Sequence, residues 1–304
     1  MAEPERSDCT LVRLAPAALV ELIEKLEPGL PRTSGLCASA RNVLEGRVEG
    51  AFYTDGWPDF TTVVFEILQP RFSDVCDLYC YTTFNPHLVR LLEQAHLVTV
   101  GRWQFLQIIE DDDRTITDYL IRTLRPDGSA KLSPDEYSVH ECGMYALVGQ
   151  LPSSSAECPV GYRLGELAVE HSTLVSSQAD TWIASIGRPV SVVEEYHKQC
   201  IQRLSSAAVF LESDPSTPVA WQMQHAISGE LGNLFTFEEH RRKGLATAVE
   251  TALCQKILAQ GDIPISSVHD VSPSVNLQHK LGFQQVCRVT EVYLYNRPVY
   301  HNDC

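Results

Sequence analysis

The hydrophobic positions in the second half of the chain change their period in a regular order. Three runs, at 207–212, 218–226 and 229–237, are separated by Ser/Asp/Pro and Ser-Gly turns, which predicts three strands. Apolar residues then recur at helical steps from Leu245 to Leu258, which predicts a helix with one buried face. The other elements predicted for this half are a strand from Tyr162, helices at 174–186, 190–204 and 274–281, and strands at 265–268, 284–289 and 291–296.

The first half shows the same two periods less regularly. Leu19, Leu22 and Leu26 recur at helical steps before Pro28-Gly29, so residues 16–28 are predicted to be helical. The other predicted elements are strands at 43–52, 61–68 and 79–82 and a helix at 86–94. From Ser129 to Pro159 the pattern weakens and ends in a turn-rich segment. We therefore predict two α/β domains, residues 1–158 and 159–304.

Composition and charge exclude some classes of partner. The chain has 304 residues, of which 44% are hydrophobic, and this is typical of a globular protein. Its formal net charge of -15 argues against binding to nucleic acid or to an anionic membrane surface. No apolar run approaches a membrane span, and the acidic N-terminus resembles neither a signal nor a transit peptide. We expect an intracellular protein that acts as a monomer.

The cysteines predict neither a disulfide framework nor a metal centre. None of the ten forms a C-x-x-C pair, so we expect reduced and mostly buried thiols. The acidic run from Glu110 to Asp113 lacks the glycine and the distal glutamate of a calcium loop. We predict no metal site and no prosthetic group.

The sequence feature that points to ligand binding is a basic turn, Arg241-Arg242-Lys243-Gly244, between a predicted strand and a predicted helix. The first N–H groups of a helix have no internal partners, and the helix dipole favours negative charge there. Strand, turn and helix together can therefore hold a phosphorylated ligand, with Gly244 allowing close approach. The alternative interpretation is an ordinary solvated turn.

Two motifs in this context resemble the GNAT acyltransferase superfamily. Arg241-x-x-Gly244-x-Ala246 is similar to its acyl-CoA pyrophosphate motif, and the segment 274–283, ending in Gly282-Phe283, is similar to its second motif. Further segments resemble the glycine N-acyltransferase family: 57–64, 181–201, Pro218-Val-Ala-Trp221 and the turn itself. The resemblance implies a GNAT fold with a mixed, mostly antiparallel sheet in the C-terminal half, after a degenerate GNAT-like α/β half.

The resemblance also implies an activity and its residues. The activity is transfer of an acyl group from acyl-CoA, used as co-substrate, to the amine of glycine or another small amino acid. Glu230 is expected to be the general base, with a raised pKa or a relaying water because a normal carboxylate is a weak base. The expected acyl-CoA ligands are Leu234, Phe235, Thr236, Arg241, Arg242, Lys243, Gly244, Leu245 and Ala246.

Several points stay open at this stage. Gln278 stands in the register where many GNAT enzymes place a tyrosine acid, so the general acid is undefined. Arg102, Arg188 and Arg203 are equal candidates for binding an acceptor carboxylate, and we interpret His269-Asp270 as a loop pair rather than a catalytic dyad. Members of the family are often mitochondrial, so the compartment expected for this protein is either the mitochondrion or the cytoplasm. Rival functions are acetylation of a protein or polyamine amine, which the acidic charge suits, and non-catalytic acyl-CoA binding.

Overall fold

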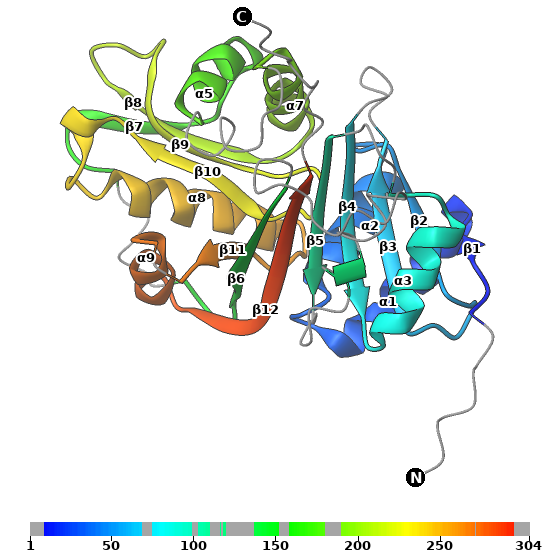
Figure 1. Cartoon of the computed structure of the whole chain (residues 1–304). Helices are drawn as coiled ribbons and strands as arrows, with labels where there is room; N and C mark the ends of the chain where they lie inside the picture. Colours follow the sequence, from blue (N-terminus) through cyan, green and yellow to red (C-terminus); the bar gives the residue numbers. More distant parts are fainter. Residues whose placement is uncertain are drawn as a thin grey trace, which may run out of the picture.

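The computed structural model describes residues 9–68, 75–98, 103–109, 116, 118–119, 137–151, 158–179, 190–270 and 272–294. Its larger sheet has eight strands in the order β1-β2-β3-β4-β5-β12-β6-β11 (Figure 1). Their bounds are β1 Val12–Arg13, β2 Gly50–Thr54, β3 Thr62–Ile67, β4 Val75–Thr82, β5 Trp103–Ile109, β6 Tyr137–Leu147, β11 Ile265–His269 and β12 Phe283–Leu294. Its described pairs are antiparallel except β4 with β5, which run parallel.

A second sheet of four strands has the order β10-β9-β8-β7 and is antiparallel throughout. These strands are β7 Tyr162–Gly165, β8 Ser206–Leu211, β9 Pro218–Gln224 and β10 Leu231–Thr236. The α-helices are α1 Leu19–Leu26, α2 Ser34–Leu44, α3 Asn85–Gln94, α5 Ser172–Gln178, α7 Val190–Arg203, α8 Leu245–Ala259 and α9 Ser274–Lys280. The predicted class, mixed α/β with mostly antiparallel sheets, is confirmed.

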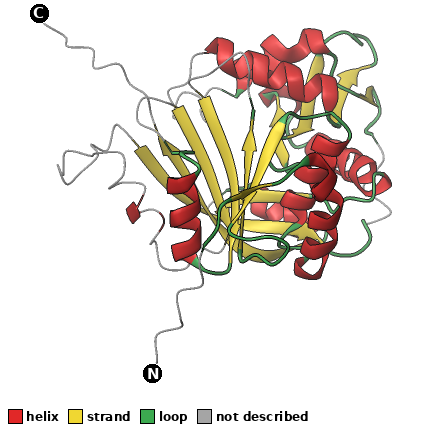
Figure 2. Cartoon of the chain, turned by 90° about the vertical axis from the view of Figure 1, so that its right-hand side faces the viewer, coloured by secondary structure: helices red, strands yellow, loops and turns green. Residues whose placement is uncertain are grey.

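Alternation along the strands decides which helix covers each face of a sheet. In β3, Phe65 packs with α1 and α2 side chains, whereas its neighbour Val64 packs with α3. In β8, Val209 packs with α8 and Phe210 with the cluster that contains α5 and α7. Both sheets therefore have helices on two sides, as Figure 2 shows from the side, and a strand covered on two faces is a continuous apolar run.

Several predicted elements are confirmed and others are wrong. Strands β8, β9 and β10 of the second sheet and helices α3 and α8 lie close to their predicted positions. The two final strands predicted at 284–289 and 291–296 are instead one strand, β12, because Val289-Thr290-Glu291-Val292 contains no turn residue. The strand predicted at 43–52 is the end of α2 followed by β2, and strands β5 and β6 were not predicted at all.

Helix α2 was missed because its residues are small rather than amphipathic. It reads Ser-Gly-Leu-Cys-Ala-Ser-Ala, and most of it is buried. A Cβ on Gly35 would collide with the ring of Tyr79, so the helix approaches β4 closely only because this position lacks a side chain. Ser39 Oγ donates to the carbonyl of Ile227 at 2.8 Å, which joins α2 to the second half of the chain.

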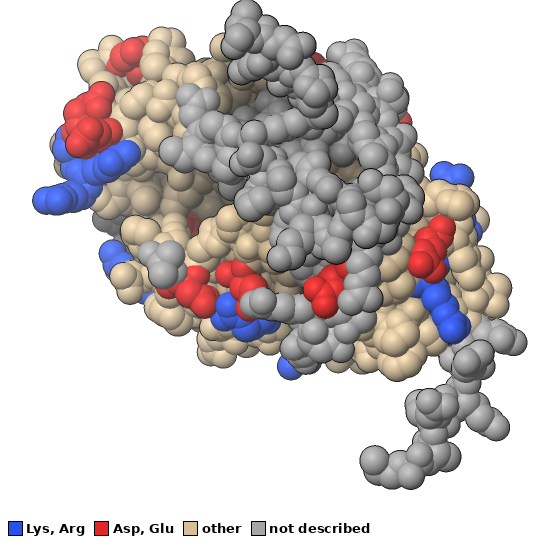
Figure 3. Space-filling view, viewed as in Figure 1, with Lys and Arg blue, Asp and Glu red and all other residues tan. Residues whose placement is uncertain are grey.

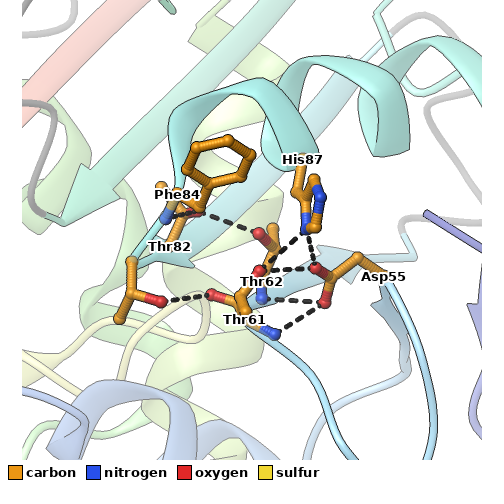
Figure 4. Close-up of polar contacts among 7 residues, drawn as sticks. Asp55, Thr61, Thr62, Thr82, Phe84 and His87 are labelled. Carbon is orange, nitrogen blue, oxygen red and sulfur yellow. Dashed lines mark hydrogen bonds and ion pairs between the residues drawn. The ribbon is translucent and has the colours of Figure 1, made fainter. Parts of the chain in front are cut away.

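A closed polar network follows strand β2 (Figure 4). Asp55 Oδ1 accepts the N–H groups of Thr61 and Thr62 at 2.8 and 2.9 Å, and Oδ2 accepts Thr61 Oγ1 and His87 Nδ1, each at 2.5 Å. Thr62 Oγ1 bonds Thr82 Oγ1 at 2.8 Å. Burial opposes ionisation of Asp55, but these hydrogen bonds outweigh it and lower its pKa. The network fastens the loop after β2 to α3.

The division into residues 1–158 and 159–304 stays a prediction. Strand β6 lies before residue 158, yet it pairs with β11 and β12, which lie after it. Strand β12 pairs in turn with β5 of the first half. The larger sheet therefore runs across the predicted boundary.

Candidate functional site

A cavity lies between the edge strands of the two sheets. Strand β10 is an edge of the smaller sheet and β11 is an edge of the larger one, and the two do not pair. A cavity of about 240 Å³, here called the central cavity, is lined by residues 231–233 of β10 and by Ser267 and His269 of β11. Two strands that diverge leave backbone groups available to a ligand between them.

Glu230 directly precedes β10 and lines the central cavity. Its residue is only 5% exposed, and its Oε1 accepts Gln107 Nε2 at 2.9 Å. Burial raises the pKa of Glu230, against hydrogen bonds from Gln107, Ser267 and Ser228 that lower it. Burial therefore prevails at this carboxylate, which lies at the gap between β10 and β11.

Strand β10 bulges just beyond Glu230. Asn233 and Leu234 stand opposite the single residue Gln222, and Asn233 has φ of 52°. His197 fixes this backbone: Asn233 Nδ2 donates to His197 Nε2 at 2.8 Å, and His197 Nδ1 bonds Ser176 Oγ at 2.9 Å. Burial lowers the pKa of His197 to about 3, so it is neutral and accepts at Nε2.

The floor of the central cavity is one face of the larger sheet. Gln107 of β5 stands opposite Glu291 of β12, and Cys142 of β6 stands opposite His269 of β11. All four line the cavity together with Tyr293. Burial raises the pKa of Glu291 to about 7. Sequence reasoning missed Gln107, Cys142, Glu291 and Tyr293 because their strands were unpredicted or wrongly divided.

The described lining has an uneven charge. It contains three carboxyl side chains, Asp77, Glu230 and Glu291, and no Arg or Lys. Of the candidate cations, Arg203 lines a different cavity of about 520 Å³, beside Lys198 and Arg47. Arg102 and Arg188 lie outside the described residues.

The basic turn lies beyond the other end of β10. Arg241 Nε donates to the carbonyl of Thr236 at 3.0 Å, and Lys243 Nζ donates to Tyr162 Oη at 2.9 Å. Gly244 has φ of 83°, and a Cβ there would meet no atom of the described residues within 4 Å. Backbone conformation therefore accounts for this glycine, and the space beside it is open. Figure 3 shows basic and acidic side chains next to each other at the edge of the molecule where this turn lies in Figure 1.

Helix α8 begins at Leu245, and among the residues that the structure describes no side chain caps its N-terminus. Its first N–H groups, including those of Leu245 and Ala246, have no partner within the helix, as in any α-helix. The predicted ligands on β10 are half-buried: Phe235 stacks on Trp221 with ring centroids 4.8 Å apart, and Leu234 packs with the cluster that contains α8 side chains. The side chains of Leu234 and Phe235 therefore pack against the core.

The structure also shows the contacts of Gln278 and of the pair His269-Asp270, which the sequence had left open. Gln278 is buried, is absent from the described lining of the central cavity, and donates Nε2 to Glu250 Oε1 at 2.6 Å. His269 ends β11 and faces the cavity, while Asp270 accepts Arg288 Nη1 at 3.0 Å. His269-Asp270 is therefore not a dyad, and the expectation that both are loop residues is wrong for His269.

The chain adopts the GNAT fold. The FR47-like protein family model matches residues 209–293, which contain Glu230, the basic turn and most of β12. A solved Drosophila melanogaster protein matches with a TM-score of 0.69 at 15% identity, covering 96% of this chain and 100% of that one. A GCN5-related N-acetyltransferase-like protein from Streptococcus suis matches with a TM-score of 0.53 at 13% identity, covering 92% and 100%. These likenesses concern the fold and do not distinguish a glycine N-acyltransferase from other GNAT proteins.

No curated protein matches the sequence. Within the described part of the chain, no helix has the length and apolar character needed to cross a lipid bilayer.

Proposed function

We propose that this protein is an acyl-CoA-dependent N-acyltransferase in which Glu230 is the general base. The observation that carries the proposal is the position of this buried carboxylate, in a cavity between the unpaired edges of β10 and β11. The same strand leads to the basic turn and to the uncapped start of α8. One strand of six residues thus connects a base to an anion-binding device roughly 20 Å away.

In this mechanism the amine nitrogen attacks the carbonyl carbon of the thioester. A C–N bond forms and the C–S bond breaks, the amine proton passes to Glu230, and the CoA thiolate leaves and takes a proton from solvent. The bulge at Asn233 frees backbone near the carbonyl, and a backbone N–H there would stabilise the developing oxyanion by about 3–4 kcal/mol. Arg241, Arg242, Lys243 and the first N–H groups of α8 would hold the CoA pyrophosphate.

Two classes of acceptor amine are candidates for the proposed reaction. The sequence resemblance favours glycine or another small amino acid, whose carboxylate needs a cationic or multi-donor pocket. The described lining instead has three carboxyl groups and no Arg or Lys. This composition favours the second candidate, a cationic amine without a carboxylate, such as a polyamine.

The test is thiol release from acetyl-, benzoyl- and long-chain acyl-CoA, each with glycine, other small amino acids, spermidine and a lysine-containing peptide. Turnover with any pair supports N-acyl transfer, and the preferred amine selects between the two acceptors. CoA binding without turnover for every pair would reject the enzyme and leave the non-catalytic alternative. If Glu230→Gln matches the wild-type rate at all pH values, Glu230 is not the base.

A further inference from the structure

Three side chains from three adjacent strands meet on the floor of the central cavity. Cys142 of β6 stands opposite His269 of β11, and Glu291 of β12 lies on the same face of the sheet. The cysteine sulfur, one imidazole nitrogen and one carboxylate oxygen all lie within 4.8 Å of one another. The sequence predicted no metal site because spacing along the chain cannot show ligands that only the sheet brings together.

We propose that Cys142, His269 and Glu291 form a binding site for Zn²⁺ or a similar thiolate-preferring divalent cation. Zinc takes sulfur, nitrogen and oxygen ligands, with distances of about 2.3 Å to sulfur and about 2.0–2.1 Å to nitrogen. At a tetrahedral angle these bonds hold the sulfur and nitrogen about 3.5 Å apart. Cys142 Sγ and His269 Nδ1 are 3.5 Å apart.

The surroundings support a cation at this place. Cys142 is 1% exposed and Glu291 is 9% exposed, so both ligands are shielded from bulk water. Glu230 lines the same cavity, and no described lining residue is an Arg or Lys. Tyr293 Oη donates to Glu291 Oε2 at 2.8 Å, which orients the carboxylate as an outer partner does in many metal sites. Ligands on paired strands are also already held in place before an ion arrives.

Three protein ligands would leave one zinc position open, and because all three ligands line the central cavity, an ion held by them would lie at that cavity. A bound ion would occupy space beside Glu230 that the proposed transfer reaction needs. Zinc binding and acyl transfer should therefore exclude one another, which makes the cation an inhibitor. This consequence rests on the proposed function, whereas binding of the ion does not.

The test measures metal binding directly on the full-length, metal-stripped protein. Zn²⁺ affinity is measured by competition with a chromophoric chelator, and Co²⁺ is used to detect a thiolate-to-metal charge-transfer band. We expect one Zn²⁺ per chain at this site, and at least a tenfold loss of affinity in Cys142→Ser and in His269→Gln. Cys142→Ser should also lose the Co²⁺ band. Cys158→Ser, which changes a half-buried thiol outside the cavity, should match the wild type.

Each variant is first checked for folding by its thermal unfolding transition, and His269→Cys, which keeps a ligand, should retain the Co²⁺ band and much of the affinity. Equal Zn²⁺ affinity in the wild type, Cys142→Ser and His269→Gln would overturn the site, as would a Co²⁺ complex without a thiolate band. The activity measurement is separate: zinc should inhibit thiol release, and a chelator should restore it. Failure of the transferase with all substrates would leave the binding result unchanged.

Discussion

The network around Asp55 and the floor of the central cavity contain the same kinds of side chain, but the pKa values of their carboxyl groups are shifted in opposite directions. Each combines a buried carboxylate with a histidine from another element. Asp55 receives four hydrogen bonds, and its pKa is lowered. Glu230 and Glu291 border a cavity, and burial raises the pKa of each. A buried carboxylate whose bonds are complete stabilises a fold, whereas one beside an open space is available for chemistry.

The largest expected effect is a loss of activity on substitution of Glu230 in the central cavity, which a substitution in the Asp55 network should not cause. Glu230→Gln should lower kcat/KM by about 10²–10⁴-fold, because a positioned base contributes that much, while acyl-CoA affinity stays nearly unchanged. In the wild type only the ionised carboxylate accepts the proton, so the rate should rise with pH through a pKa above the usual value. The measurement is a pH–rate profile with chelator present. An acidic limb that persists in the variant would assign the titration to another group.

The reciprocal change tests the first region. Asp55→Ala should lower the free energy of unfolding by about 3 kcal/mol, because two backbone N–H groups lose their acceptor and His87 loses a partner. Asp55→Asn, which keeps one acceptor oxygen, should lose less. Activity per folded molecule should not change in either variant.

The pH dependence of this effect has a definite sign. Because the folded-state pKa of Asp55 is lowered, its contribution is present above the usual value of about 3.9 and is lost as the pH falls through the folded pKa. The difference between the wild type and Asp55→Asn in urea unfolding should therefore shrink in acid. A difference that grows in acid would contradict the assignment.

A fourth buried carboxylate, Glu250, lines none of the described cavities and has incomplete hydrogen bonding. Glu250 is 0% exposed, its pKa is raised to about 7, and within the described part of the chain neither its Oε2 nor Gln278 Oε1 has a hydrogen-bond partner. Its contribution to stability is full below about 4.3 and is lost as the pH rises through about 7. Glu250→Gln should therefore stabilise the protein by on the order of 2 kcal/mol at pH 8 and much less at pH 5.

Thermal unfolding of the wild type and of Glu250→Gln at pH 5 and pH 8 measures the stability difference between them. An amide at position 250 can also donate to Gln278 Oε1, so Gln278→Leu should remove part of the gain. Equal effects of Glu250→Gln at pH 5 and pH 8 would show that the carboxyl does not titrate in this range.

The smallest effect concerns the distant end of the proposed site. Arg242 is exposed in the basic turn, so Arg242→Gln should raise the KM for acyl-CoA by about two- to fivefold, with little change in kcat. The effect should fade at high salt because exposed charges are screened. Arg90→Gln on α3 removes a surface charge in the other half and serves as the control. Equal KM changes in both variants would indicate a general charge effect.

The elements of the second half were largely predictable because local period and turn residues define them, as in β10, the basic turn and α8. Glu230 could be named because the family resemblance implies a catalytic glutamate near the start of the strand that leads to that turn. Gln107, Cys142 and Glu291 could not, since their strands meet only through pairings between distant segments. Leu234 and Phe235 were named for their backbone, and their side chains pack in the core.

Strand β12 is bonded to β5 on one side and to β6 on the other. During synthesis the edge of β5 therefore stays exposed until β12, which ends at Leu294, has left the ribosome. Pairings this distant in sequence slow folding and leave the nascent chain open to aggregation. We expect the molecule to unfold as one cooperative unit, because each half needs the other to complete the larger sheet.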